Sequence, residues 1–338
     1  YAYSWYSSSD ASTWSSIGSD ASTYTLTQTE VGKYIKVSVA YTDDDGAVES
    51  HDDSHVSSTV ANVNDAGTGL SLASDGDVAD PDEDDALSVT GTLADEDGVT
   101  NAAPTYVWKR AGTAISGATS SSYTLVQADV GTIISVVISY TDDQSESNTI
   151  TLTAASDVDN VNDDPTGTVS ITGTAQEDQV LGIANNLADE DVLGTFSYQW
   201  SRGGTDVSGE TGLTYTLGQS DVGSTITVTI SYTDGQGTEE SETSAATSTV
   251  QNVNDAATVA ISGTATEDQV LTATVTDEDG ATGTITYTWK RAGTAITGAT
   301  SSTYTLVQAD GGSAITVYVS FTDDQSNGEK DTSDACLL

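Results

Sequence analysis

The sequence predicts an all-β protein built from four copies of one sandwich-sized pattern. Each copy holds a tryptophan, then a tyrosine in the next strand, then an aromatic residue that closes an alternating apolar run. In chain order these residues are Trp5, Trp108, Trp200 and Trp289, then Tyr24, Tyr123, Tyr215 and Tyr304, then Tyr41, Tyr140, Tyr232 and Phe321. Their period of about 95 residues is that of a whole domain rather than of a solenoid turn.

The fourth copy shows the expected strands most clearly. Ile285, Tyr287 and Trp289 share one face of a strand, with the period of two typical of a half-buried strand. The expected strands cover residues 258–262, 271–275, 285–289, 304–306, 315–319 and the final run up to Leu338. Short antiparallel strands around a buried tryptophan are typical of a β-sandwich of immunoglobulin type, with an up-and-down barrel as the alternative.

The repeats predict four domains, at residues 1–65, 66–163, 164–255 and 256–338, joined by short linkers rich in Asn and Asp. We expect them to form an elongated array of tandem sandwiches. Repeat 1 begins inside the strand that carries Trp5, so the sequence shows no counterpart of the two strands that precede this position elsewhere. We expect an open sheet there that strands from another copy of the protein could complete.

The composition is strongly acidic, with 52 Asp and Glu against 8 Lys and Arg and a formal net charge of −44. Such a charge excludes nucleic acid as a natural partner and repels anionic membrane surfaces, so cations are the partners to expect. The single cysteine, Cys336, cannot form an intrachain disulfide. The domains are therefore expected to be held by packing or by ions, without membrane insertion.

Carboxylates and amides recur at fixed places in every repeat. The sandwich topology puts the first and fifth turns beside the exit linker and the loops after the second and sixth strands beside the entry linker. Each junction then gathers oxygen atoms from both neighbours, and calcium prefers six to eight oxygen ligands. We expect calcium at the junction of repeats 2 and 3 on Glu83, Asp84, Asp129, Asn160, Asn162, Asp163, Asp189, Asp191 and Asp234. At the junction of repeats 3 and 4 the expected ligands are Glu177, Asp178, Asp221, Asn252, Asn254, Asp255, Asp277, Asp279 and Asp323.

Other interpretations of these and neighbouring residues remain open. Asp and Asn also favour turns for local reasons, but their recurrence at both ends of each repeat, with no basic side chain expected nearby, favours calcium. Asp277 and Asp279 could serve a glycosidase, although recurrence in every repeat suits a structural ion better. His51 and His55 are the only histidines, which excludes a histidine-based triad from repeats 2 to 4. Trp14, in an inserted loop, could stack on a sugar or simply pack in its loop.

Three motifs resemble the cadherin-like and immunoglobulin-like tandem repeats of very large bacterial surface adhesins. They are the Asn-Val-Asn-Asp linkers, Glu-Asp-Gln-Val-Leu at 177–181 and 267–271, and Tyr-Thr-Leu-Val-Gln-Ala-Asp at 304–310. The resemblance covers essentially the whole chain and implies an extracellular or surface-anchored bacterial protein with a role in adhesion. Repeat 4 departs from the pattern, because Gly311 replaces the valine of the other repeats.

We therefore expect a non-enzymatic, calcium-rigidified stalk or spacer in a bacterial surface adhesin or filament. One alternative is a self-assembling fibre or virion surface protein, built by strand complementation between chains through the open first repeat. Another is a carbohydrate-binding module that recognises surface glycans, suggested by Trp14 and by the Tyr and Thr content.

Overall fold

The computed structural model describes residues 1–52 and 58–337, and strands make up 46% of the protein against 4% for helices. The helices described are single 3-10 turns: η1 (Gln28–Glu30), η2 (Gln127–Asp129), η3 (Gln219–Asp221) and η4 (Gln308–Asp310). The predicted all-β fold of immunoglobulin-like sandwiches is confirmed. The chain divides into two compact units, Tyr1–Val161 and Asn162–Leu338.

The first unit holds the strands of repeats 1 and 2. In repeat 1 they form one sheet in the order β2-β1-β3-β4, and in repeat 2 two sheets, β5-β6-β9 and β11-β10-β7-β8. The repeat 1 strands are β1 (Ala2–Ser8), β2 (Ser15–Ser19), β3 (Tyr34–Thr42) and β4 (Val48–Asp52). The repeat 2 strands are β5 (Thr68–Ser74), β6 (Ala86–Ala94), β7 (Thr105–Arg110), β8 (Thr113–Ala114), β9 (Ser122–Thr124), β10 (Ile134–Thr141) and β11 (Ser147–Thr153).

The second unit repeats the two-sheet arrangement twice. Repeat 3 has the sheets β12-β13-β16 and β15-β14-β17-β18, and repeat 4 has β19-β20-β23 and β22-β21-β24-β25, with β26 also on β24. The repeat 3 strands are β12 (Val169–Thr172), β13 (Val180–Asn185), β14 (Ser197–Arg202), β15 (Thr205–Asp206), β16 (Thr214–Thr216), β17 (Ile226–Thr233) and β18 (Glu239–Thr243). The repeat 4 strands are β19 (Thr258–Ser262), β20 (Val270–Thr276), β21 (Thr286–Arg291), β22 (Thr294–Ala295), β23 (Thr303–Thr305), β24 (Ala314–Thr322), β25 (Gly328–Thr332) and β26 (Cys336–Leu337).

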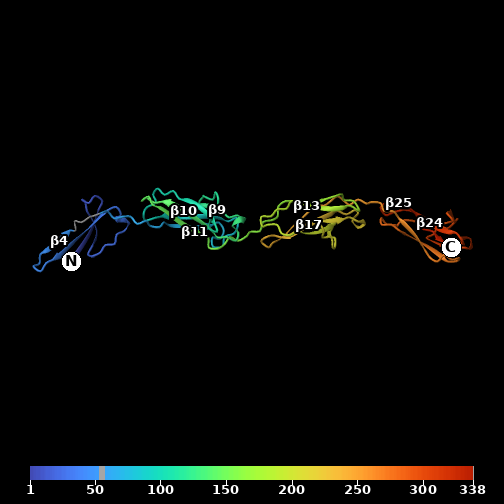
Figure 1. Cartoon of the computed structure of the whole chain (residues 1–338), viewed down its shortest axis with the longest axis horizontal. Helices are drawn as coiled ribbons and strands as arrows, with labels where there is room; N and C mark the ends of the chain where they lie inside the picture. Colours follow the sequence, from blue (N-terminus) through green and yellow to red (C-terminus); the bar gives the residue numbers. More distant parts are fainter. Residues whose placement is uncertain (53–57, 338) are drawn as a thin grey trace. The chain divides into compact units, whose positions relative to one another are not determined.

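In repeats 2, 3 and 4 the larger sheet has a hairpin at one edge. β10 pairs antiparallel with β11 and β24 with β25, and Figure 1 labels both pairs of strands. β17 pairs in the same way with β18. The final run of repeat 4, expected as one strand, is divided into β25 and β26. Ser333 causes the break, because its hydroxyl oxygen accepts the Val317 N–H at 3.0 Å and so replaces a backbone carbonyl in the ladder.

A separate buried cluster fills each of repeats 2, 3 and 4, and each cluster draws its residues from one repeat. Trp108, Trp200 and Trp289 are fully buried at the centres. Each indole N–H donates to a backbone carbonyl at 2.9 Å, which satisfies the one polar atom that a buried tryptophan carries. The clusters agree with separate domains, while the exact domain boundaries remain a prediction.

Repeat 1 has no such core in its described residues, 1–52 and 58–65. Its single sheet leaves Trp5 partly exposed, with only the ring of Tyr24 stacked on it at 5.9 Å between centroids. Tyr41, at the position of the buried Tyr140 and Tyr232, is 43% exposed. Among the described residues of repeat 1, no second sheet packs on this face.

We expect the substitution Trp200→Ala to unfold repeat 3 and to leave repeats 2 and 4 folded, because the three clusters are separate. The free energy of unfolding of repeat 3 should fall by about 3 to 5 kcal/mol, as for other buried large aromatic residues. Hydrogen exchange resolved by repeat, during thermal unfolding, measures it. The matched control is Trp5→Ala, which removes a partly exposed tryptophan and should cost much less. Melting of the whole W200A chain in one cooperative step would contradict separate cores.

Candidate metal centre

Three carboxylates converge where repeats 3 and 4 meet, inside the second unit. Glu177, Asp255 and Asp279 each offer one oxygen atom, and these atoms lie within 4.8 Å of one another. We name these three residues the junction group. Glu177 lies between β12 and β13, Asp255 in the linker before β19, and Asp279 in the loop after β20. Glu177 and Asp279 are only 2% and 1% exposed, so two of the charges are almost completely removed from water.

Backbone contacts fix Glu177 beside the linker. Its N–H donates to the carbonyl of Gln251 at 2.9 Å, and its Oε2 accepts the N–H of Val253 at 3.2 Å. The side chain of Gln219, turned so that its amide nitrogen faces Glu177, donates to Oε1 at 2.7 Å. The turn after the first strand therefore lies at the exit linker, where the topology predicts it.

Two hydrogen bonds connect the linker to Asp279 and Asp279 to Asp277. Its Oδ2 accepts the N–H of Asp255 at 2.7 Å, and its own N–H donates to Oδ1 of Asp277 at 2.9 Å. These two bonds explain why acidic residues alternate here, since each carboxylate accepts a backbone N–H of another acidic residue. The same two bonds recur in repeat 2 through Asp65, Asp97 and Asp95, and in repeat 3 through Asp163, Asp191 and Asp189.

Burial raises the pKa of Glu177, and the nearby charges of Asp255 and Asp279 raise it further, against the lowering effect of the Val253 N–H. Burial likewise raises the pKa of Asp277, with added repulsion from Glu329, Asp279 and Asp323. Both shifts have one cause, which is negative charge that is desolvated beside other negative charge. A hard divalent cation with oxygen ligands would remove this repulsion.

The aspartates at the ends of the 3-10 turns have another role. Asp221 Oδ1 accepts from Arg202 Nε at 2.5 Å and from the Tyr215 hydroxyl at 2.7 Å, while Oδ2 accepts the Gly218 N–H at 2.9 Å. The expectation that no basic side chain lies near the acidic positions is wrong here. Asp129, which pairs with Arg110 and Tyr123, is a second predicted ligand held in this way, and Asp310 pairs with Arg291 and Tyr304.

The structure places the other predicted ligands as follows. Asp84 and Asp178 are exposed turn residues with φ of 68° and 62°, so ordinary turn chemistry accounts for them. Asn252 is half-buried in the linker, and the Asn254 amide donates to Glu329 at 2.9 Å. Asp234 and Asp323 are buried in the β17–β18 and β24–β25 turns.

The set predicted for the junction of repeats 2 and 3 is divided between the two units. In the first unit, the Glu83 N–H donates to the Asp159 carbonyl at 2.9 Å, and Asn160 Oδ1 accepts from Gln127 at 3.2 Å. In the second unit, the Asn162 amide donates to Glu240 at 2.9 Å. Glu240 and Glu329 were missed from sequence alone, because strand alternation places them but does not show what they face.

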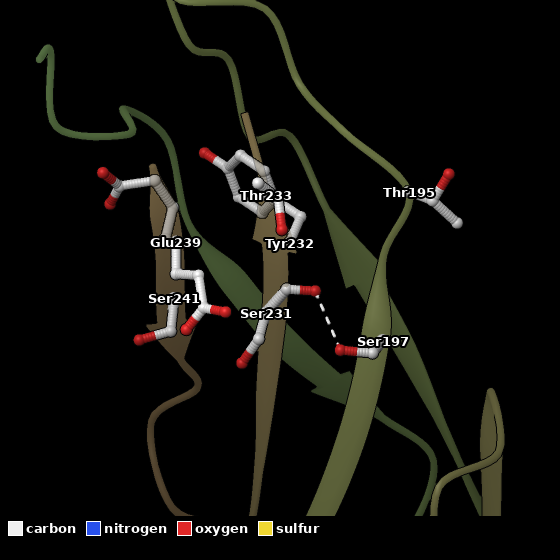
Figure 2. A pocket seen from close by; sticks show the side chains of 8 residues that line it. Thr195, Ser197, Ser231, Tyr232, Thr233, Glu239 and Ser241 are labelled. Atoms are coloured by element: carbon white, nitrogen blue, oxygen red, sulfur yellow. Dashed lines mark hydrogen bonds between the residues drawn. The ribbon is translucent and has the colours of Figure 1, made fainter. Parts of the chain in front are cut away.

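An open hollow of about 410 Å³ lies along β14, β17 and β18. Figure 2 shows its lining of small hydroxyl residues, among them Ser197, whose hydroxyl donates to the carbonyl of Ser231 at 3.0 Å. Tyr232, also at this hollow, uses its hydroxyl to donate to Asp189 at 2.6 Å. A comparable hollow of about 440 Å³ occupies the same place in repeat 2. Neither has the exposed aromatic face on which sugars stack.

The remaining candidates from the sequence concern repeat 1. Trp14 is half-buried and lies under Lys36 of β3, whose Nζ is 5.0 Å from the ring centroid, so it packs on the sheet of repeat 1. His51 is exposed in β4, and His55 lies outside the described residues. No helix in the described part of the chain is long and apolar enough to cross a membrane.

No protein-family model and no curated protein matches the chain. Among solved structures it is similar to a Ca²⁺-stabilized adhesin that helps an Antarctic bacterium bind ice, at 16% identity over 90% of this chain and 81% of that one, with a TM-score of 0.29. Mouse cadherin-23 EC22-24 shows 14% identity over 78% and 97% of the chains, with a TM-score of 0.30. Three domains of the outer capsid protein Hoc of bacteriophage RB49 show 15% identity over 80% and 98%, with a TM-score of 0.21. These scores are too low to assign a family.

The Arg–Asp–Tyr contacts predict a pH-dependent stability. Burial opposes ionisation of Asp310, but the Val307 N–H, Arg291 and Tyr304 hold its pKa below the ordinary value. Ionised Asp310 therefore stabilises repeat 4 above the unfolded-state pKa, and this contribution is lost as pH falls through the lower folded-state pKa. We expect Asp310→Asn to cost about 2 kcal/mol near neutral pH, because Arg291 loses its partner, and much less in acid.

Denaturant midpoints of repeat 4 at neutral and acidic pH measure this difference. Asp268→Asn removes an exposed charge from the same repeat and serves as the control, with little effect at either pH. A D310N cost that is the same at both pH values would contradict the role of the ionised carboxylate.

Proposed function

We propose that the chain is a non-enzymatic, extracellular stalk or spacer segment of a bacterial surface adhesin or filament, and that calcium rigidifies it at the junctions between repeats. The observation that carries the proposal is the junction group. Glu177, Asp255 and Asp279 bring three carboxylates from one repeat, the linker and the next repeat within 4.8 Å of one another. A cation bound there would hold the three segments together.

Calcium suits this group better than other common metals do. The candidate ligands are oxygen atoms, and no cysteine or histidine of the described residues belongs to the group, which disfavours the usual zinc and copper donor sets. The junction is also crossed by a linker, and calcium tolerates more irregular geometry than magnesium. Extracellular modules bind calcium with dissociation constants of about 0.1 to 1 mM, which suits a protein that works outside the cell.

The rest of the sequence supports a surface location and a spacer role. A net charge of −44 keeps the chain away from nucleic acid and anionic membranes. Tandem repeats with one core each extend a chain without needing a catalytic centre. The buried carboxylates recur in repeat after repeat, as a structural ion requires and an enzyme active site does not.

One observation favours the fibre alternative. The uncovered sheet of repeat 1 exposes Tyr41 and part of Trp5, and a strand pair from another copy could cover it. Light scattering of the whole chain at rising concentration distinguishes the two functions. Defined polymers would favour the fibre, and a monomer at all concentrations favours the stalk. Glycan binding finds less support, because Lys36 lies over the ring of Trp14 on which a sugar would stack.

We expect calcium to restrict the motion of the linker between repeats 3 and 4. Without the ion, like charges repel by about 1 kcal/mol per close pair in water and by more where they are desolvated. Small-angle scattering of the whole chain should therefore give a narrower distribution of dimensions in millimolar calcium than in chelator. Calcium at 100 times its dissociation constant should also stabilise the folded state by about 2.7 kcal/mol.

The test substitution is Glu177→Gln, which keeps the shape of the side chain and removes a buried charge. E177Q should weaken the narrowing of the scattering dimensions by calcium, and it should raise the free energy of unfolding in chelator. Asp178→Asn is the control, because it removes an equal charge from the next, exposed residue. Equal calcium responses in wild type and E177Q, with no calcium binding by calorimetry, would show that these acidic residues are ordinary turn residues.

A further inference from the structure

A second group of polar residues recurs around the hairpin turn of repeats 2, 3 and 4. It consists of the first aspartate of the Asp-x-Asp loop, the aspartate that opens the hairpin turn, and the residue paired across the hairpin with the last aromatic. We name it the hairpin cup. Its members are Asp95, Asp142 and Asn148 in repeat 2, Asp189, Asp234 and Glu240 in repeat 3, and Asp277, Asp323 and Glu329 in repeat 4.

In repeat 4 the cup contains carboxylate oxygens that lack partners among the described residues. Asp323 is 5% exposed, and its Oδ1 accepts the N–H groups of Gln325 and Asn327 at 2.9 and 2.7 Å. Its Oδ2 is buried and accepts no hydrogen bond, and Oδ2 of Asp277 is in the same condition. Glu329, 8% exposed, is held in place by the Asn254 amide at 2.9 Å.

Repeat 3 has the same arrangement with one difference. Asp234 is 7% exposed, and its Oδ2 is likewise buried without a hydrogen bond. Glu240 is held by the Asn162 amide at 2.9 Å, as Glu329 is by Asn254. The difference lies at the first aspartate, because the Tyr232 hydroxyl donates to Asp189 Oδ2 at 2.6 Å. Repeat 4 has Phe321 at that position and cannot make this bond.

In repeat 2 an amide closes the cup. Asn148 stands where the other repeats have glutamate, and its Nδ2 donates to Oδ2 of Asp142 at 2.9 Å. The same amide exchanges hydrogen bonds with Asn64 at 2.9 and 3.3 Å, and the Tyr140 hydroxyl donates to Asp95 at 2.5 Å. Asp142 is therefore satisfied by a neutral donor, with one negative charge fewer than in the other cups.

We propose that the hairpin cups of repeats 3 and 4 each bind a divalent cation, and their oxygen ligands favour calcium. The cup of repeat 2 binds none, because the Asn148 amide takes the place of the ion. An unpaired buried carboxylate strongly destabilises the folded state unless a counter-charge or hydrogen-bond donors satisfy it. Repeat 2 supplies a donor, and repeats 3 and 4 supply a second carboxylate instead, which adds repulsion unless a cation is bound. The inference extends the proposed function, since it assigns further ions of the same kind.

The same cup position holds glutamate in repeat 4 and asparagine in repeat 2, so each residue can replace the other in variants of the whole chain. Glu329→Asn copies the repeat 2 cup into repeat 4 and should lower the calcium stoichiometry by one ion in calorimetry. Asn148→Glu copies the repeat 4 arrangement into repeat 2 and should raise the stoichiometry by one. Asp323→Asn keeps the oxygen that accepts the turn N–H groups and should also lose one ion, which guards against a folding defect specific to E329N.

Two further variants separate this inference from the proposed function. Asp324→Asn removes an exposed charge from the same turn and should leave the stoichiometry unchanged. Glu177→Gln should lose a different ion, so its effect should add to that of D323N. If E177Q loses an ion while E329N and D323N lose none, the cups are empty and the junction group stands. If none of the three loses an ion, the proposed calcium function fails as well. An N148E chain that binds no extra calcium would overturn the role assigned to Asn148.

Discussion

Burial of carboxylates at the ends of the repeats is the constraint on which the rest of this structure depends. Glu177, Asp279 and Asp323 are each at most 5% exposed, and the protein has 8 basic residues for 52 acidic ones. Lysine and arginine are too few to pair with most of these charges. Buried carboxylates that face one another at a linker therefore repel unless a cation or hydrogen-bond donors neutralise them.

The repeats use two different solutions for a buried aspartate. Inside repeats 2 to 4, an arginine from the tryptophan strand and a tyrosine satisfy the aspartate at the end of the 3-10 turn, as Arg202 and Tyr215 do for Asp221. This pairing is internal and needs no ion. At the ends of the repeats no such arginine contacts the junction group or the cups of the described structure. The first solution needs no ion, and the second is the basis of the proposal that a cation holds the repeats together.

Local patterns predicted most of the fold. Alternation of apolar residues placed β19 correctly and β21 to within a residue or two, because one face of each strand packs on the core while the other meets water. The break between β25 and β26 could not be predicted, since it depends on the Ser333 hydroxyl reaching the backbone of Val317.

The site was less predictable than the fold, because it depends on register and on distant partners. Glu177, Asp255 and Asp279 recur at turn positions, and the sandwich topology brings them together. The partner of Asp221 was not predictable, since Arg202 reaches it from another strand that carries no local signal of the contact. Glu329 was missed, because only the pairing of β24 with β25 places it opposite Phe321.

Anomalous diffraction from crystals of the whole chain grown with calcium tests the central claim most directly, because it locates each bound ion. The account predicts an ion between Glu177, Asp255 and Asp279, with further ions beside Asp234 and Asp323. It predicts none beside Asp142, where the Asn148 amide already donates. Density for water alone at Glu177, Asp255 and Asp279, at millimolar calcium, would contradict the claim that buried carboxylates at the ends of the repeats are neutralised by a cation.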